Sequence, residues 1–166
     1  MEYNRRKSPR LKGFDYNTPG MYFVTVCTYK MRMLFWDNPT HPKNDNFEYN
    51  LNFAGKIANE TIKSLPNQFP VEIQKYVVMP NHIHIILLVK SNCGIKTLTG
   101  IVSRSIGYLK MRISHKLREF NVDDVIWQRS FHDHIIRTER EYQRIWDYIE
   151  NNPAEWENDC FFDSAT

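Results

Sequence analysis

The sequence predicts an α+β fold of the ferredoxin-like type, in which a βαββαβ antiparallel sheet carries helices on one face and is followed by a C-terminal helix. Short segments rich in β-branched and aromatic residues alternate with longer segments whose apolar residues recur at helical spacing. Their order is strand, helix, strand, strand, helix, strand, helix, and its first six members match the ferredoxin-like order. The 166 residues contain no internal repeat and no long Pro/Gly/Ser linker, so we expect one domain.

The elements of the N-terminal half follow from local patterns. Residues 21–30 are rich in aromatic and β-branched residues, which predicts a strand. After a loop rich in Pro, Asn and Asp, residues 47–51 are a candidate for a short edge strand. Apolar residues at helical spacing from Asn52 predict a helix that ends at Pro66. A hairpin follows, with its strands at residues 71–79 and 82–89.

The C-terminal half continues with a long helix, a strand and a last helix. Apolar residues form one seam over residues 97–119, and residues 125–136 supply another strand. Thr138 and Glu141 form a capping box for a helix over residues 139–151. In a ferredoxin-like domain two helices cover one sheet face, so we expect the other face to be open for a catalytic or nucleic-acid site.

Composition excludes several classes of protein. With 42% hydrophobic and 25% charged residues, a mean hydropathy of -0.57 and no apolar run near ~18 residues, the chain fits neither a disordered nor a membrane protein. The basic first twelve residues are not followed by an apolar segment, so we expect no secretory signal and a cytoplasmic location. Cys27, Cys93 and Cys160 are odd in number and lack C-x-x-C spacing, which argues against a disulfide framework and a cysteine-built zinc site.

The distribution of charge indicates nucleic acid more than the net charge of +3 does. One basic cluster lies near the N-terminus and another lies on the long helix. The residues that we predict to bind DNA are Arg5, Arg6, Lys7, Arg10, Arg104, Lys110 and Arg112. For the helix, an ordinary solvated face is the alternative interpretation.

His82 and His84 form a candidate metal site. Side chains two apart share one face of a strand, so both imidazoles point away from the apolar row that includes Ile83 and Ile85. Their ring nitrogens can then reach one ion, although ordinary surface or hydrogen-bonded histidines have the same spacing. Two protein ligands leave room for water and phosphate oxygens, which suits Mg²⁺ or Mn²⁺ acting as a Lewis acid on a phosphodiester.

Tyr148 is the candidate nucleophile for such a reaction. Tyr148 and Asn152 are four residues apart on the last helix, so they share a face, and the Asn152 amide oxygen could complete the coordination of the ion. A phenol titrates near ~10, so attack at neutral pH requires a nearby positive charge or base. Alternatively, Tyr148 packs its ring between Ile145 and Ile149, and Asn152 is simply a helix C-terminal residue before a proline.

Four ordered segments carry a resemblance to a known family. They are GFDYNTPGMYFVTVCT, VVMPNHIHIILL, WQRSFHDHIIR and YIENNP, and they span the chain from about Arg10 to about Trp156. In this order and spacing they resemble the REP-associated tyrosine transposases, a branch of the single-tyrosine HUH transposases. The resemblance implies a basic segment at residues 1–12, one HUH transposase-like domain at residues 13–153 and a short tail at residues 154–166.

The resemblance also implies a mechanism and a partner. It gives His82 and His84 as metal ligands, Tyr148 as nucleophile and Asn152 as a polar third ligand, although Pro153 leaves the aim of Asn152 less fixed. Tyr148 would attack a phosphate of single-stranded, hairpin-forming DNA, leaving a 5′-phosphotyrosine and a free 3′-OH that later rejoins strands. A DNA transposase at the nucleoid is therefore expected, with the tyrosine acting within one chain or across a homodimer.

Two other functions remain as alternatives. A module of the same fold could bind hairpin nucleic acid without cutting it, and a metal-dependent phosphodiesterase could use water in place of Tyr148. Two neighbouring features are not expected to be functional. His132 and His134 are interpreted as polar residues that support the sheet, and Tyr142 lies on a different helix face from Tyr148.

Overall fold

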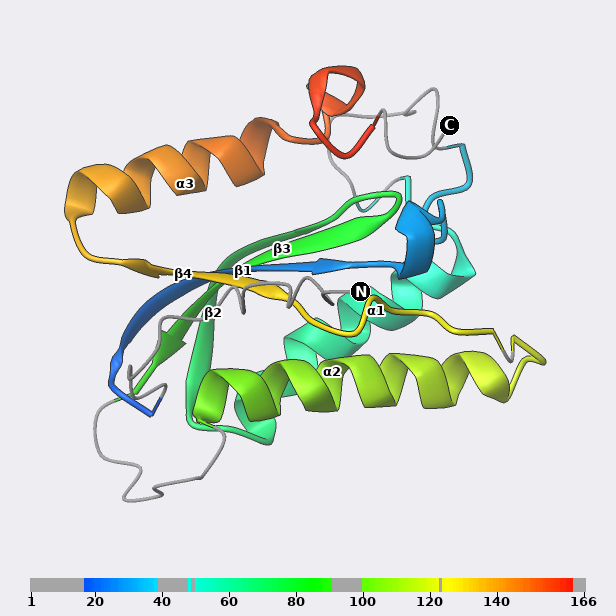
Figure 1. Ribbon diagram of the computed structural model, residues 1–166, viewed down its shortest axis with the longest axis horizontal. Helices are drawn as coiled ribbons and strands as arrows, with labels where there is room; N and C mark the ends of the chain where they lie inside the picture. The colour runs from blue at the N-terminus through cyan, green and yellow to red at the C-terminus, as the bar shows by residue number, and fades with distance from the viewer. Residues whose placement is uncertain (1–16, 39–47, 49, 91–99, 123, 163–166) are drawn as a thin grey trace, which may run out of the picture.

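The fold is seen in a computed structural model, which describes residues 17–38, 48, 50–90, 100–122 and 124–162 (Figure 1). The predicted DNA-binding residues Arg5, Arg6, Lys7 and Arg10 lie outside these ranges. The strands are β1 (Gly20–Cys27), β2 (Val71–Val78), β3 (His82–Val89) and β4 (His132–Ile136), and the helices are α1 (Phe53–Ser64), α2 (Ile101–Arg118) and α3 (Glu139–Asn151). None of the helices described here is both long and apolar enough to cross a bilayer.

The four strands form one antiparallel sheet in the order β2-β3-β1-β4. This order, with α1 between β1 and β2 and α2 between β3 and β4, is the predicted ferredoxin-like βαββαβ arrangement, which is therefore confirmed. The two central strands pair so that His84 lies opposite Thr25 and His82 lies opposite Cys27. The sequence signal for β3 thus places both histidines in the middle of the sheet.

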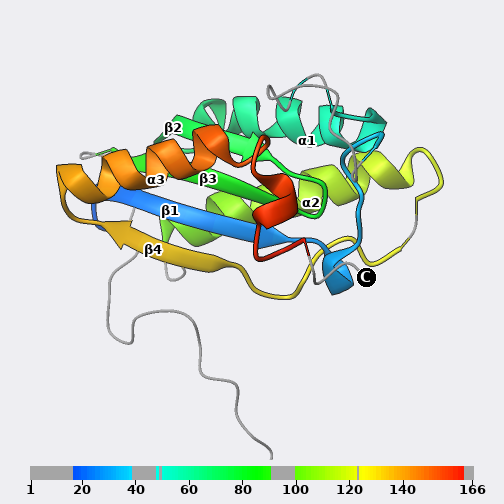
Figure 2. The same cartoon turned by 90° about the horizontal axis from the view of Figure 1, so that it is seen from above.

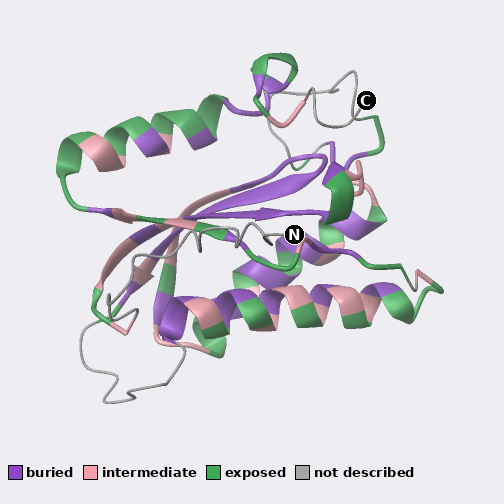
Figure 3. Cartoon of the chain, viewed as in Figure 1, coloured by how far each residue is buried: buried purple, intermediate pink, exposed green. Residues whose placement is uncertain are grey.

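The helices lie on both sides of the sheet. Helices α1 and α2 cover one face, and α3 runs across the other face (Figures 1 and 2). Strand β3 is buried on both faces, as its nearly continuous buried colouring shows (Figure 3). Side chains are therefore buried on both faces of the sheet, and those of the histidines lie between β3 and α3.

The expectation of an open sheet face is wrong at β3. The side chains of His82 and His84 are 0% and 1% exposed. Helix α3 carries a buried apolar stripe with Ile145 and Ile149, and such a stripe must be removed from water by packing on the sheet. Trp156, just beyond the helix, is fully buried and lies against the His82 ring at 6.0 Å between centroids.

Strand β4 is shorter than predicted, because its expected N-terminal part does not pair as a ladder. Trp127 makes only an isolated bridge with Thr28. The Lys110 ammonium donates to the carbonyls of Gln128 at 2.8 Å and Ser130 at 2.9 Å, so a side chain satisfies groups that a neighbouring strand would otherwise pair. Of the predicted edge strand at residues 47–51, the described residues 48, 50 and 51 make one bridge, between Trp36 and Leu51, and residues 47 and 49 lie outside the described ranges.

Two helices begin at side-chain caps, and the cap at Thr138 is the one that the sequence predicts. Asn52 accepts a hydrogen bond from the Gly55 backbone N–H at 3.0 Å and begins α1. The Thr138 hydroxyl accepts from the Glu141 backbone N–H at 3.2 Å and begins α3. These caps fix where each helix leaves the sheet, and for α3 they set the register that brings Tyr148 over β3.

Candidate active site

The two histidines lie side by side at the start of β3. Their ring centroids are 4.4 Å apart, and the rings contact α3 and the segment after it, with Tyr148 beside His84 and Trp156 beside His82. β3 begins at His82, directly after the turn at Pro80 and Asn81. Because side chains alternate along a strand, His84 lies on the same face of the sheet as His82. The predicted pairing of the imidazoles is confirmed.

His82 is held as a neutral imidazole with one free lone pair. Its Nδ1–H donates to Asn81 Oδ1 at 2.8 Å, while the Asn81 amide N–H donates to the Phe161 carbonyl at 3.0 Å, which fixes the amide orientation. The Nε2 atom is therefore unprotonated, and among the described residues it is buried with no hydrogen-bond partner. Burial lowers the pKa of His82 from 6.5 to about 3.

His84 is oriented by a neighbour on β1. Its Nδ1 lies 2.9 Å from the Thr25 hydroxyl, and its Nε2 faces α3. Burial holds the pKa of His84 well below its usual value, and the adjacent His82 lowers it further. Both imidazoles are therefore uncharged at neutral pH, which is the state in which histidine binds a metal.

Tyr148 reaches the histidine pair from α3 of the same chain. Its hydroxyl oxygen lies 3.2 Å from His84 Nε2, and the hydroxyl donates to the Asp159 carboxylate at 3.2 Å. Its side chain is 41% exposed, so the ring is open to solvent on one side while its hydroxyl faces the buried imidazoles. Burial raises the pKa of Tyr148 above its usual value of 10, and the negative charge of Asp159 raises it further.

Asp159 is the site residue that sequence analysis missed. Asp159 is 9% exposed, and its carboxylate accepts from the Asn152 amide N–H at 2.7 Å and the Phe161 backbone N–H at 2.7 Å, besides the Tyr148 hydroxyl. It lies in the segment interpreted as a short tail. The aromatic residues of that segment, Trp156 among them, were the signal that it packs on the domain.

The donor set fits a divalent metal ion. One ligand atom each from His82, His84 and Asp159 lie within 4.8 Å of one another. Asn152 adds an amide oxygen that is buried and without a hydrogen-bond partner among the described residues, while its amide nitrogen is held by Asp159. Orphaned acceptors cost free energy unless something binds them, and two imidazoles with oxygen ligands suit ions such as Mn²⁺ or Mg²⁺.

The predicted DNA-binding residues of α2 are not brought to this site. Arg104, Lys110 and Arg112 lie on α2, on the sheet face opposite α3 (Figure 1). The Lys110 ammonium is engaged by the two carbonyls described above, and burial lowers its pKa from 10.5 to about 8. A role in DNA binding for these residues stays a prediction.

The neighbouring polar residues have structural partners. His134 Nε2 lies 2.6 Å from the Glu141 carboxylate and so links β4 to α3, in keeping with its interpretation as a supporting residue. Within the described ranges, His132 and His134 are not part of a metal-binding group. Tyr142 packs on Trp146, at 5.7 Å between ring centroids.

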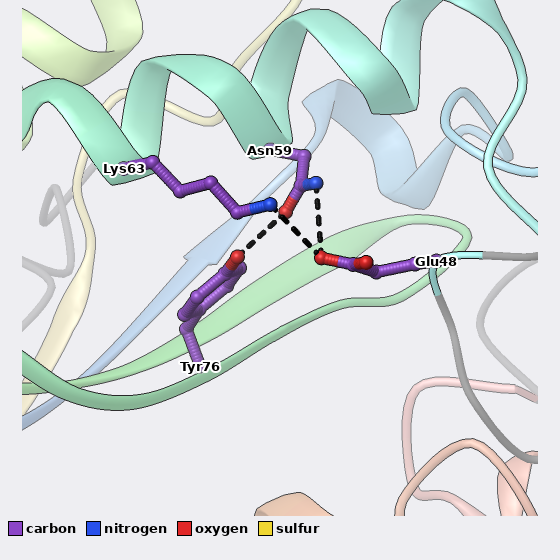
Figure 4. A network of polar contacts seen from close by, with 4 residues as sticks. All are labelled: Glu48, Asn59, Lys63 and Tyr76. Atoms are coloured by element: carbon purple, nitrogen blue, oxygen red, sulfur yellow. Dashed lines mark hydrogen bonds and ion pairs between the residues drawn. The ribbon is translucent and has the colours of Figure 1, made fainter.

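A cavity of about 990 Å³ lies at the β2 edge, and its lining does not include His82, His84 or Tyr148. A polar network on its wall is shown in Figure 4. The Tyr76 hydroxyl donates to the Asn59 amide oxygen at 2.8 Å, and the Asn59 amide and the Lys63 ammonium donate to Glu48 at 3.2 Å and 3.1 Å. These hydrogen bonds tie residue 48 to α1 and β2.

Comparison with known proteins decides the family. Residues 22–152, which hold both histidines, Tyr148 and Asn152, match the family model described as "Transposase IS200 like". The chain belongs to the IS200-like transposase family. This IS200-like transposase is 33% identical to an uncharacterised Haemophilus influenzae protein, over 96% of this chain and 94% of that protein. It is 28% identical, over 84% of this chain and 73% of the relative, to an H. influenzae protein provisionally named a REP-associated tyrosine transposase.

Two solved structures share the fold of this transposase. A REP-associated tyrosine transposase bound to a REP hairpin superposes with a TM-score of 0.57 at 24% identity, covering 94% of this chain and 74% of that chain. A transposase-like protein from Deinococcus radiodurans superposes with a TM-score of 0.50 at 15% identity, covering 86% and 97%. The family and the fold together support a transposase type of function.

Proposed function

We propose that this transposase cuts and rejoins single-stranded DNA through a covalent link to Tyr148. The observation that carries the proposal is the position of the Tyr148 hydroxyl, 3.2 Å from Nε2 of a buried, uncharged imidazole in its own chain. A packing tyrosine on a helix surface has no need of such a partner. A nucleophilic tyrosine needs to lie beside the metal site, because its oxygen must come close enough to the scissile phosphate to form a bond.

The reaction exchanges one phosphodiester for another. The Tyr148 phenolic oxygen forms a bond to phosphorus, the bond from phosphorus to the 3′ oxygen of the preceding nucleotide breaks, and the phenolic proton ends on that 3′ oxygen. The product is a 5′-phosphotyrosine and a free 3′-OH. Attack by a 3′-OH on the phosphotyrosine reverses the bond changes and rejoins DNA, so the cycle requires no external energy source.

Mg²⁺ or Mn²⁺ is the proposed cofactor, held by His82, His84 and the Asp159 carboxylate. The Asn152 amide oxygen, the third ligand expected from the sequence, lies next to this set because Asp159 holds the Asn152 amide nitrogen. When bound, the ion supplies Lewis-acid charge at the phosphate oxygens. Asn81 and Thr25 contact the other ring nitrogens and so fix the orientation of both imidazoles.

The environment of Tyr148 supports a role for a cation in the proposed reaction. Burial and Asp159 both disfavour the phenolate, so the protein alone keeps the nucleophile protonated at neutral pH. Positive charge near His82 and His84 reverses the effect of Asp159 and favours the phenolate. Under this proposal Tyr148 would react only when the metal is bound.

Hairpin-forming DNA is the proposed substrate. One relative of this fold was solved as a REP-associated tyrosine transposase bound to a REP hairpin. The basic N-terminal residues Arg5, Arg6, Lys7 and Arg10 are proposed to add phosphate contacts. Because Tyr148 contacts His84 of the same chain, the site does not need a second protomer to be complete. A homodimer in which each protomer carries its own site is compatible with this arrangement.

The test is trapping of the covalent intermediate. A DNA hairpin with randomised single-stranded flanks is incubated with the protein and Mn²⁺, once labelled at the 3′ end and once at the 5′ end. We expect the 3′-labelled fragment to remain on the protein, with mass spectrometry locating the adduct on Tyr148. Tyr148→Phe should abolish the adduct, whereas Tyr142→Phe, which removes a hydroxyl from another face of α3, should leave it.

The other outcomes distinguish the alternatives. Tight hairpin binding without an adduct under any metal condition would indicate a binding module of the same fold. Cleavage that survives Tyr148→Phe would indicate a phosphodiesterase that uses water. Retention of the 5′-labelled fragment would mean that the tyrosine bonds to the other side of the phosphate.

A further inference from the structure

Two hollows lie between β4 and the first half of α3, and the nucleophile Tyr148 lines the first of them. The first has a volume of about 470 Å³ and is lined by Phe23, His134, Arg144, Ile145 and Tyr148. The second has a volume of about 700 Å³ and is lined by Arg137, Thr138, Arg140, Glu141 and Arg144. Arg144 lines both, so the two hollows are neighbours, and together they are called the cleft, which runs from Tyr148 toward the start of α3.

The outer part of this cleft is positively charged. Arg137, Arg140 and Arg144 are exposed, and among the described residues none of the three is in an ion pair. The one acidic residue of the lining, Glu141, is already engaged by His134 at 2.6 Å and by the Arg137 backbone N–H at 2.9 Å. The guanidinium groups are therefore available to phosphates.

The inner part of the cleft is aromatic and apolar. Phe23 is half-buried beside the nucleophile, with its ring 6.3 Å from the Tyr148 ring and nearly perpendicular to it at 88°. Ile145 contributes a buried aliphatic wall. An aromatic side chain beside arginines is the combination that proteins use for unpaired nucleotides, because the base stacks while its phosphate is neutralised.

We propose that this cleft is the subsite for the unpaired nucleotides that adjoin the scissile phosphate. A base stacks at Phe23, and the phosphates along the strand contact Arg144, Arg140 and Arg137. The volume of the inner hollow falls within the roughly 300 to 1,000 Å³ of small-ligand sites. The assignment rests on the proposed function, because the cleft matters only if Tyr148 attacks DNA.

The position of the cleft favours it over α2 as the path of the strand. A nucleotide that reaches Tyr148 must lie on the α3 side of the sheet, where Arg140 and Arg144 are found. Arg104 and Arg112 lie on α2, behind the sheet from the nucleophile (Figure 1). Charge on α2 can attract DNA at a distance but cannot hold the reacting segment.

Matched charge removal on the two faces tests the proposal. In a Tyr148→Phe background, which removes cleavage, the double variants R140Q/R144Q and R104Q/R112Q each lose two positive charges. Binding of a fluorescent oligothymidylate of about 12 nucleotides is measured by anisotropy as a function of salt. Each lost phosphate contact lowers the salt slope by ~0.7 for single strands, so R140Q/R144Q should lower it by about 1.4, which is roughly 25-fold in affinity at 0.1 M salt.

Three results would overturn the proposal. The first is an equal or larger loss of affinity in R104Q/R112Q, since charge removal would then act without regard to the face. The second is an unchanged affinity in R140Q/R144Q. The third is equal affinity for an abasic strand of the same length, which has the phosphates but no bases to stack. The covalent-adduct assay is independent of these measurements, so a Tyr148 adduct in the wild type with unchanged binding in R140Q/R144Q would reject the cleft and keep the function.

Discussion

Mild acid should destabilise the metal-free protein, because His82 and His84 are buried and uncharged. Burial lowers the pKa of His82 to about 3 and holds the pKa of His84 well below its usual value. Unfolding returns both rings to water, where the pKa is near ~6.5. Below that pH the unfolded chain binds two more protons than the folded chain, so stability that is present above pH ~6.5 is lost as the pH falls toward the folded pKa values.

The magnitude follows from the two pKa values. Between about pH 7.5 and pH 5.5, a ring that stays neutral in the fold and titrates near ~6.5 when unfolded lowers the free energy of unfolding by about 1.4 kcal/mol. Two such rings lower it by about 2.7 kcal/mol, a large part of the roughly 5 to 15 kcal/mol typical of a domain. Urea unfolding followed by tryptophan fluorescence, in the presence of a chelator, measures this difference directly.

A variant with one titrating ring fewer is the control. His82→Gln keeps a polar side chain at the site but cannot gain a proton in this range, so its loss of stability between the same pH values should fall to about 1.4 kcal/mol. The comparison uses the change in the free energy of unfolding between the two pH values. A lower absolute stability of the variant therefore does not affect it. A wild-type stability that is flat over this range, or the same slope in His82→Gln, would refute the burial of neutral imidazoles.

Two further predictions concern the packing of α1 and the metal site. Gly55→Ala should lower the free energy of unfolding by about 1 to 3 kcal/mol, because a Cβ there would overlap the Phe35 carbonyl oxygen. Gly107→Ala on α2, where a Cβ would meet nothing, should raise it by roughly 0.4 to 1 kcal/mol, and urea unfolding that gave both variants the same sign would contradict this packing. Asp159→Asn should weaken Mn²⁺ binding roughly 10- to 100-fold by calorimetry, whereas the exposed Asp147→Asn should not, and equal affinities would remove Asp159 from the ligand set.

The parts of the site that the sequence predicts are those that depend on local periodicity. His82 and His84 share a face because strand side chains alternate, and Tyr148 and Asn152 share a face because helix residues four apart do. The order of elements then determines the ferredoxin-like topology, since a hairpin between two crossover helices has few ways to join one antiparallel sheet. These relations depend on local backbone geometry and not on contacts with distant segments of the chain.

The parts that the sequence analysis did not predict depend on contacts between distant segments. The interpretation of one buried and one open face for β3 relied on the histidines being polar, yet six of the eight residues in the strand are apolar. A nearly continuous apolar run is typical of a strand that is buried on both faces. Asp159 meets Tyr148 only because the chain turns back after α3 and buries Trp156, which no local pattern specifies.

The burial of the histidines restricts how DNA can reach them. His82 and His84 are at most 1% exposed, whereas Tyr148 is 41% exposed, so the approach is from the tyrosine side of the site. Tyr148 lines two of the described hollows: the inner hollow of the cleft, which it shares with Phe23, and a further hollow of about 280 Å³, which it shares with Asn152 and Asp159. Under the proposed function, a strand that enters one hollow and leaves by the other would pass the Tyr148 hydroxyl. Arginine variants in the cleft and Asp159→Asn should therefore impair the same reaction in different ways, the first through DNA affinity and the second through metal affinity.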